Sequence, residues 1–201
     1  MERKAKLERE TKETKVIVEL DIDGSGNSNI NTSIGFFDHL LTQIAVHGSF
    51  DMKIFADGDL SIDNHHVIED TAIVLGKVFN KALGEKFGIV RVGYSFFPMD
   101  ESLAFVAVDI SSRPFFVKDI NWVNPFLGSK EENLIPVDLI EHFLYSFSIN
   151  AKITLHVKSF YGQNNHHIVE ALFKALGKAL DNASRIDSKR NQRIPSSKGS
   201  L

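Results

Sequence analysis

The stretch Asn64-His65-His66-Val67-Ile68-Glu69 occurs a second time, about a hundred residues later, as Asn165-His166-His167-Ile168-Val169-Glu170. Each copy opens a helical pattern that runs on to a Leu-Gly-Lys triplet, at 75–77 and at 176–178. Two adjacent histidines followed by a carboxylate are uncommon even once in a chain, and a repetition in the same frame is hard to attribute to chance. The repeated stretch therefore predicts an internal duplication.

The hydrophobic pattern around both copies supports this prediction. In the first half, the pattern predicts strands at 16–22 and 30–34, a helix at 36–46, a strand at 50–56 and a helix at 67–87. In the second half, it predicts strands at 91–98 and 103–110, a helix at 137–149, a strand at 153–160 and a helix at 165–182. Single histidines also correspond, because Asp38-His39 in the first half matches Glu141-His142 in the second. Both halves therefore follow the order strand, strand, helix, strand, helix.

These elements predict a single domain over 1–201, made of two repeats at about 9–90 and 91–186. A basic, polar tail follows at 187–201. A loop is expected at 117–133, around the only tryptophan of the chain, Trp122. This loop matches no motif, so no role is predicted for it.

The composition restricts the classes of function. The chain has no cysteine, which excludes disulfides, thiolate catalysis and cysteine-ligated zinc, so a metal would be held by nitrogen and oxygen atoms. A formal net charge of −3 gives no reason to expect nucleic acid or a membrane surface as a partner. No run of about 18 apolar residues occurs, and the N-terminus lacks the apolar stretch of a signal peptide. We expect a cytoplasmic protein.

The duplicated histidines predict two metal ions. Helix residues three or four apart share a face, so His66 can bind an ion together with Glu69, while His65 points elsewhere. If each first histidine reaches the ion of the other motif, and if the single histidines add a fourth ligand, two four-residue sets result. The predicted sets are His39, His66, Glu69 and His166 for ion one, and His65, His142, His167 and Glu170 for ion two.

Such sets leave coordination positions open for a substrate, as catalytic metal sites do. Imidazole and carboxylate ligands suit zinc, iron, nickel or manganese, and the ligand types alone do not choose among them. The alternative reading is that histidines near helix starts are ordinary polar surface residues. The duplication with matching upstream histidines makes that reading the weaker one.

Several further motifs resemble those of the imidazoleglycerol-phosphate dehydratase family, from about Arg9 to the C-terminus. Besides the two histidine stretches, which extend to Asp70 and Ala171, the matching residues are Glu13-Thr14, Phe37-Asp38-His39-Leu40-Leu41 with His47-Gly48, Pro98-Met99-Asp100-Glu101-Ser102-Leu103, Ser112-Arg113-Pro114, Phe173-Lys174-Ala175 and Pro195-Ser196-Ser197-Lys198-Gly199. Ser112 stands where the family usually has glycine, and Val67 where it usually has threonine.

The resemblance implies a hydro-lyase that removes water from D-erythro-imidazole-glycerol phosphate to give imidazole-acetol phosphate in L-histidine biosynthesis. It implies two Mn²⁺ ions, held by the eight residues above, with the substrate ring bound between them as an imidazolate. Such ions would stabilise the ring anion, whose electrons can expel the hydroxyl group. Glu13 matches the family's base for the neighbouring proton, although by sequence alone it is one charge in a charged N-terminal run.

The resemblance also implies contacts to the substrate and its phosphate. Matching cations and tail residues for the phosphate are Arg91, Arg113, Lys174, Ser196, Ser197 and Lys198. Gln43 and His47 lie one and two helical turns beyond His39 and match substrate-contacting positions, as Glu13 does. Without the resemblance, each isolated arginine or lysine would be taken as a solvated surface charge.

For the fold, the resemblance implies an α+β protein with duplicated β-β-α-β-α halves, like domain 2 of ribosomal protein S5. The helices should pack between two four-stranded sheets, although the sequence pattern shows only three strands per half. The family forms 24-subunit shells, so a homo-oligomer with active sites between subunits is expected. The first histidine of one repeat, which points away from the ion of its own motif, would then come from a neighbouring chain.

Two other functions fit the same residues. A dinuclear metallohydrolase holds its metals about 3.5–4 Å apart, usually with a bridging carboxylate, and no aspartate offers itself as that bridge. A non-catalytic shell protein, with metals that only hold subunits together, would not need Glu13 or the phosphate-matching cations. The dehydratase accounts for more of the sequence than either alternative.

Overall fold

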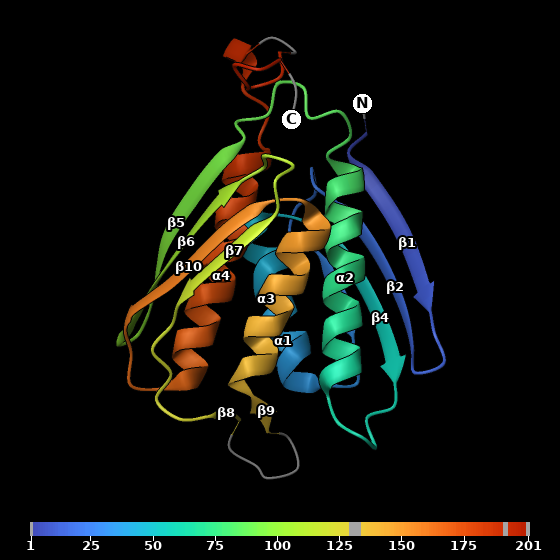
Figure 1. Cartoon of the computed structure of the whole chain (residues 1–201), viewed down its shortest axis with the longest axis vertical. Helices are drawn as coiled ribbons and strands as arrows, with labels where there is room; N and C mark the ends of the chain where they lie inside the picture. Colours follow the sequence, from blue (N-terminus) through green and yellow to red (C-terminus); the bar gives the residue numbers. More distant parts are fainter. Residues whose placement is uncertain (1, 129–133, 191–192, 200–201) are drawn as a thin grey trace.

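A computed structural model describes residues 2–128, 134–190 and 193–199. Two four-stranded sheets enclose a layer of four helices (Figure 1). The first sheet has the order β1-β2-β4-β3, formed by β1 (Lys4–Glu10), β2 (Thr14–Asp21), β4 (Asp51–Gly58) and β3 (Ser28–Asn31). β2 is antiparallel to both β1 and β4, whereas β3 runs parallel to β4.

The second sheet repeats this topology. Its order is β5-β6-β10-β7, formed by β5 (Val92–Met99), β6 (Ser102–Asp109), β10 (Thr154–Tyr161) and β7 (Phe115–Asp119). β6 is antiparallel to both β5 and β10, and β7 runs parallel to β10. The two halves therefore share strand order and direction, which confirms the predicted duplication and the α+β class.

The helices between the sheets are paired across the two halves. They are α1 (Gly35–Gly48), α2 (His65–Ala82), α3 (Val137–Ala151) and α4 (Asn165–Ser184). Helix α1 packs against α4, and α2 packs against α3, so each pair takes one helix from each half. This pairing brings the single histidines of one half to the histidine motif of the other.

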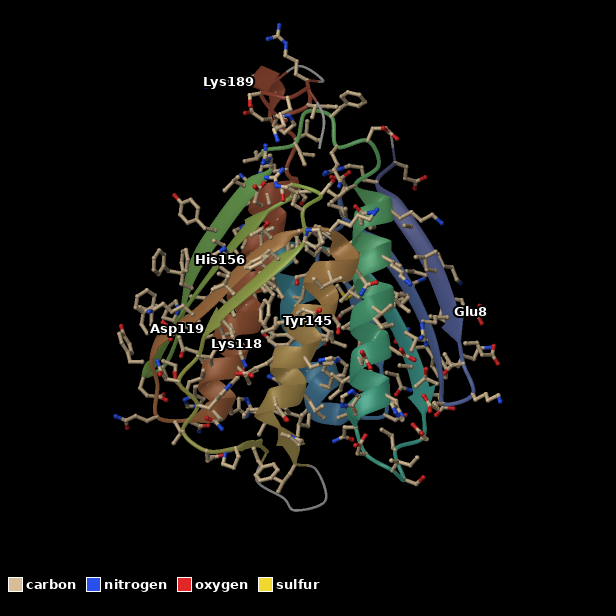
Figure 2. All side chains as sticks on the ribbon, in the orientation of Figure 1. Glu8, Lys118, Asp119, Tyr145, His156 and Lys189 are labelled. Atoms are coloured by element: carbon tan, nitrogen blue, oxygen red, sulfur yellow. The ribbon has the colours of Figure 1, made fainter. Side chains whose placement is uncertain are left out.

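Alternating side chains build the core between sheets and helices. Every second residue of β2 is buried, among them Val16, Val18 and Leu20, and β6 shows the same alternation. The opposite faces of the strands carry polar and charged residues such as Glu8 on β1, which points away from the helices (Figure 2). The period-two pattern of the inner strands thus fixes which face of each sheet meets the helices.

Glycines set how closely the paired helices approach. A methyl group added at Gly76 of α2 would lie 2.7 Å from the Phe147 carbonyl oxygen of α3. At Gly177 of α4 it would lie 2.7 Å from the Ile44 carbonyl oxygen of α1. Both positions belong to the repeated Leu-Gly-Lys triplets, so these triplets mark the two helix crossings.

The sequence pattern missed some strands. β1 carries an exposed Lys/Glu alternation, and only Ala5 and Leu7 turn toward the core, so its hydrophobic signal is weak. Charged side chains of this kind are common on edge strands. β7 begins before the predicted loop at 117–133, and β8 (Phe126–Leu127) lies within it, paired with β9 (Ile135–Pro136). Residues 129–133 of that loop lie outside the described residues.

The C-terminal segment is attached to the end of the domain where α2 finishes (Figure 1). A short helix, η2 (Ser188–Arg190), follows a backbone hydrogen bond of 2.8 Å from Asp187 to the Gly88 carbonyl oxygen. Further on, the Gly88 amide donates to the Arg193 carbonyl oxygen at 3.0 Å. Among the described residues, no helix is both long enough and apolar enough to cross a membrane.

Candidate metal centre

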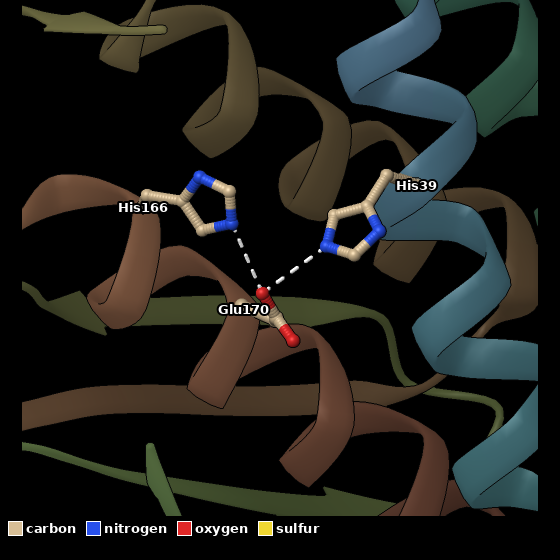
Figure 3. A group of neighbouring side chains, drawn as sticks. All are labelled: His39, His166 and Glu170. Atoms are coloured by element: carbon tan, nitrogen blue, oxygen red, sulfur yellow. Dashed lines mark hydrogen bonds and ion pairs between the residues drawn. The ribbon is translucent and has the colours of Figure 1, made fainter. Parts of the chain in front are cut away.

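One group of possible metal ligands lies between α1 and α4, and we call it the α1–α4 cluster. It consists of His39, His166 and Glu170 (Figure 3). The Nε2 atoms of His39 and of His166 each lie 3.1 Å from Oε2 of Glu170. The two imidazole rings are 5.7 Å apart, centroid to centroid. Three donor atoms therefore converge on one point from two helices.

The second group, the α2–α3 cluster, repeats this arrangement with His65, Glu69 and His142. Nε2 of His142 lies 3.0 Å from Oε1 of Glu69, and Nε2 of His65 lies 3.5 Å from Oε2 of Glu69. In both clusters the helix motif supplies a histidine and a glutamate four residues apart, which share a helix face. The facing helix of the other half supplies the third residue.

The carboxylates of both clusters are held ionised. Burial raises the pKa of Glu170, but hydrogen bonds from Lys174 and His39 outweigh this effect and lower its pKa to about 2. Lys174 contacts Oε1 of Glu170 at 2.8 Å, and Glu170 itself is only 6 % exposed. A hydrogen bond from His142 lowers the pKa of Glu69 against an opposing effect of burial. Both carboxylates are thus anionic acceptors for a cation.

The donor sets fit a divalent transition metal. In each cluster one ring nitrogen of each histidine and one carboxylate oxygen lie within 4.8 Å of one another. Two imidazoles and one carboxylate are ligands used by catalytic sites for zinc, iron and manganese. Three protein donors leave room for a further ligand and for substrate.

The clusters differ from the predicted division of the eight residues between two ions. His39 and His166 meet Glu170, not Glu69, and His65 and His142 meet Glu69. The predicted i,i+3 pairs join the second histidine of each motif to the glutamate, but neither His66 nor His167 belongs to a cluster. Helical geometry allows both spacings, and the packing of α2 on α3 and of α4 on α1 selects the first histidine instead.

The second histidine of each motif is bound to another carboxylate. Nδ1 of His66 lies 3.0 Å from Oδ1 of Asp59, and Nδ1 of His167 lies 2.6 Å from Oε2 of Glu101. Asp59 raises the pKa of His66. The hydrogen bond from His167 is the largest of several that lower the pKa of Glu101 to about 2.

The predicted base lies beside one of these histidines. Oε2 of Glu13 is 3.9 Å from Nε2 of His66, and the Glu13 side chain is 58 % exposed. Asp59 and Glu101 were not predicted as site residues. Glu101 stands within the Met-Asp-Glu-Ser motif that carries the resemblance, whereas Asp59 lies in a turn without a recognisable signal.

Three predicted substrate contacts lie next to the α1–α4 cluster. Nε2 of Gln43 is 3.4 Å from Nδ1 of His39, and the Lys174 ammonium group contacts the cluster through Glu170. The ring of His47 packs edge-on against Phe97 at 4.8 Å. Burial, with a smaller effect of Lys174, lowers the pKa of His47, which favours its neutral form.

The other predicted phosphate contacts lie at the opposite end of the domain. Arg91 binds Asp109 through two nitrogens, at 2.6 and 3.0 Å, and donates to the Pro195 carbonyl oxygen, so its side chain anchors the segment that contains Ser196, Ser197 and Lys198. Arg113 lies nearby, 66 % exposed, with Nη2 3.9 Å from Asp109. We call Arg113 and residues 196–198 the basic end.

Helix α2 separates the clusters from the basic end. His65 begins this helix of 18 residues, which is about 27 Å long at 1.5 Å per residue. Lys86, just beyond its far end, donates to the Ser112 hydroxyl at 2.8 Å, next to Arg113. One chain therefore does not bring its basic end to its own clusters.

Comparison with known proteins identifies the family of this chain. The family model for imidazoleglycerol-phosphate dehydratase matches residues 32–180. The imidazoleglycerol-phosphate dehydratase of Roseiflexus is 50 % identical over 199 residues, which cover 99 % of this chain and 98 % of the relative. That of Thermoanaerobacter pseudethanolicus is 51 % identical over 199 residues, which cover 99 % and 100 %.

Solved structures that match this chain come from the same family as these relatives. The chain superimposes on imidazoleglycerol-phosphate dehydratase from Staphylococcus aureus with a TM-score of 0.80 and 34 % identity, covering 92 % of this chain and 99 % of the other. The enzyme from Pyrococcus furiosus, solved in complex with (S)-C348, matches with a TM-score of 0.81 and 38 % identity, covering 97 % and 100 %. The chain belongs to the imidazoleglycerol-phosphate dehydratase family.

Proposed function

We propose that the protein removes water from D-erythro-imidazole-glycerol phosphate to form imidazole-acetol phosphate in L-histidine biosynthesis, with two Mn²⁺ ions. The observation that carries this proposal is the pair of matching His₂Glu clusters, each of which offers three donor atoms to an ion and would leave further positions for other ligands. Relatives about 50 % identical over the whole chain bear the name of this activity. A ring with two nitrogen atoms is a suitable ligand for two such ions.

Each cluster would hold one ion through its three residues. The fourth protein ligand would be the second histidine of a motif, His66 or His167, from a neighbouring chain, because neither ring reaches a cluster of its own chain. When bound, the two ions would act as Lewis acids that stabilise the substrate ring as an imidazolate. This grouping replaces the predicted sets while it keeps the same eight residues.

Other residues would handle the proton and orient the substrate. The exposed carboxylate of Glu13 lies beside His66, where it can take the proton from the carbon next to the one that loses the hydroxyl group. Gln43 and the neutral ring of His47 border the α1–α4 cluster and offer hydrogen bonds to the substrate chain. Lys174 adds a positive charge near this cluster, through Glu170.

The phosphate-binding cations support sites between subunits. Arg113 is exposed and makes only long contacts, to Asp109 at 3.9 Å and to the Ser111 carbonyl oxygen at 3.5 Å, so its guanidinium group can offer a bidentate contact to a phosphate. Arg91, in contrast, is committed to Asp109 and the tail. The separation of about 27 Å along α2 means that the basic end would serve a cluster of another chain. We therefore propose that each site lies between copies of this chain. The family resemblance implies a shell of 24 such subunits.

The bridged metallohydrolase is less well supported. Glu69 and Glu170 belong to separate clusters, and no residue of the described chain belongs to both clusters. A dinuclear hydrolase usually has a carboxylate shared by both ions. The exposed Glu13 beside His66 likewise has no purpose in a shell protein whose metals only connect subunits.

The decisive experiment is an activity assay with imidazoleglycerol phosphate on metal-stripped protein, with and without added Mn²⁺. Activity should return with Mn²⁺, and Glu13→Gln should retain metal content and oligomer size but lose turnover. Glu8→Gln, a change of an exposed carboxylate on the outer face of β1, is the matched control and should remain active. Absence of turnover in the Mn²⁺-loaded wild type would refute the proposed function.

A further inference from the structure

Two carboxylates that lie outside both clusters hold the second histidine of each motif in the same way. Asp59, directly after β4, contacts Nδ1 of His66 with both oxygens, at 3.0 and 3.1 Å. Glu101, in the turn between β5 and β6, contacts Nδ1 of His167 at 2.6 Å. Both halves thus bind Nδ1 of the second histidine with a carboxylate, although the carboxylate comes from a different position in each half.

A carboxylate can only accept a hydrogen bond, so each contact places the ring hydrogen on Nδ1. In the neutral ring, Nε2 then carries the free lone pair, which is the form needed for a metal ligand. On that side, Nε2 of His66 lies 3.9 Å from Glu13, and Nε2 of His167 lies 3.8 Å from Asp100, both beyond hydrogen-bond distance. The Nε2 atoms of His66 and His167 therefore keep a lone pair that is available to bind a metal ion.

We propose that Asp59 and Glu101 are positioning residues, which fix the tautomer and direction of His66 and His167 so that Nε2 can bind a metal ion held by a neighbouring chain. This role rests on the proposed function, because the clusters must bind metal for it to matter. Hydrogen-bonded partners of metal-ligating histidines commonly have such an effect, and their loss weakens metal binding by about 10–100-fold.

The duplication shows how the two halves came to use different carboxylates. Glu13 precedes the first residue of β2, and Glu101 precedes the first residue of β6, so they occupy equivalent turns. Glu101 contacts His167, the Ser102 hydroxyl and the Gln163 amide. The Glu13 side chain makes no hydrogen bond to a described residue, and its carboxylate stays exposed.

The second half has no carboxylate at the position that matches Asp59. Gly58 and Gly162 are equivalent, because a Cβ at Gly58 would meet Val67 and Thr14, and a Cβ at Gly162 would meet the matching Ile168 and Ser102. The next residue is Asp59 in the first half and Gln163 in the second. Glu101 therefore supplies the contact in the second half, whereas Asp59 supplies it in the first and leaves Glu13 free for proton transfer.

The test combines the tautomer of each ring with metal affinity. Long-range ¹⁵N–¹H spectra of metal-free protein labelled at histidine report which ring nitrogen carries hydrogen. We expect His66 and His167 in the Nδ1–H form, lost at His66 in Asp59→Ala and at His167 in Glu101→Ala. Manganese titrations followed by electron paramagnetic resonance should show about 10–100-fold weaker Mn²⁺ binding in both variants.

Conservative and control variants separate positioning from folding. Asp59→Asn and Glu101→Gln keep a carbonyl oxygen that can accept the Nδ1 hydrogen, so they should restore the tautomer and most of the Mn²⁺ affinity. Glu8→Ala removes an exposed carboxylate on β1 and should change neither measurement.

Either an unchanged tautomer in the alanine variants or Mn²⁺ affinity within twofold of wild type would overturn the positioning role. A wild type that binds no Mn²⁺ would instead refute the proposed metal centre. The tautomer spectra are recorded without metal, so the two failures are distinguishable.

Discussion

Replacement of Gly177 by alanine tests whether the α1–α4 contact sets both stability and the geometry of the cluster. The added methyl group would lie 2.7 Å from the Ile44 carbonyl oxygen and 3.0 Å from the Gly48 amide nitrogen. These are backbone atoms of α1, which no side-chain rotation can move away. α1 must therefore shift by roughly 0.7 Å to reach an ordinary contact distance of 3.4 Å.

The net change in the free energy of unfolding follows from two opposing contributions. Alanine favours a helix interior over glycine by about 1 kcal/mol, whereas overpacking of a close contact costs about 1–3 kcal/mol. We expect a net loss of about 1 kcal/mol, which lowers the Tm of a chain of this size by roughly 2–4 °C. The shift of α1 also separates His39 from Glu170, now 3.1 Å apart, and a loss of 1 kcal/mol there weakens Mn²⁺ binding about fivefold.

The assay is thermal unfolding of metal-free protein by circular dichroism, followed by a Mn²⁺ titration. Gly35→Ala is the matched control, because a Cβ at Gly35 meets no atom within 4 Å. That control should keep or raise the Tm and leave Mn²⁺ binding unchanged. A Gly177→Ala variant that gained stability as the control does would show that the close contact does not determine the helix spacing.

Three more predictions concern the basic end and the metals. Arg113→Ala, which removes an exposed guanidinium group, should raise KM for imidazoleglycerol phosphate by about 10–100-fold with little change in kcat; an unchanged KM would argue for a structural role. Ser112→Gly relieves the strain of a left-handed backbone at φ 56° but removes the hydroxyl group that accepts a hydrogen bond from the buried Lys86. The free energy of unfolding should therefore fall by about 1 kcal/mol in thermal unfolding, and a higher Tm would contradict this expectation. Saturating Mn²⁺ at a hundred times its Kd should raise the Tm by roughly 5–10 °C, and an unchanged Tm would speak against binding to the folded state.

Much of the fold could be predicted because the duplicated pattern repeats its helices and inner strands. β1 could not be predicted from hydrophobicity, because its outward side chains are charged and only Ala5 and Leu7 face the core. Likewise, Phe115 and Val117 of β7 are exposed, so this strand shows no buried alternation.

The ligand residue types could be predicted, but their pairing could not, because His65 and His66 both lie within one helical turn of Glu69. A signal was nevertheless present. His65, Glu69 and Gly76 are separated by four and seven residues and therefore lie along one face of α2. Gly76 lies at the crossing of α2 with α3. The face of α2 that carries His65 and Glu69 therefore packs against α3, which explains why the first histidine joins the cluster.

The crosswise pairing of the helices has a consequence for the origin of the chain. His39 finds its carboxylate in the second half, and His142 finds its carboxylate in the first. A half-length ancestor would have contained no complete cluster as a monomer, whereas two identical copies packed as these halves are would have formed two equivalent ones. Fusion linked the two copies covalently, so that both clusters form within one chain. It also allowed one copy to change without the other, as the difference between Asp59 and Gln163 shows.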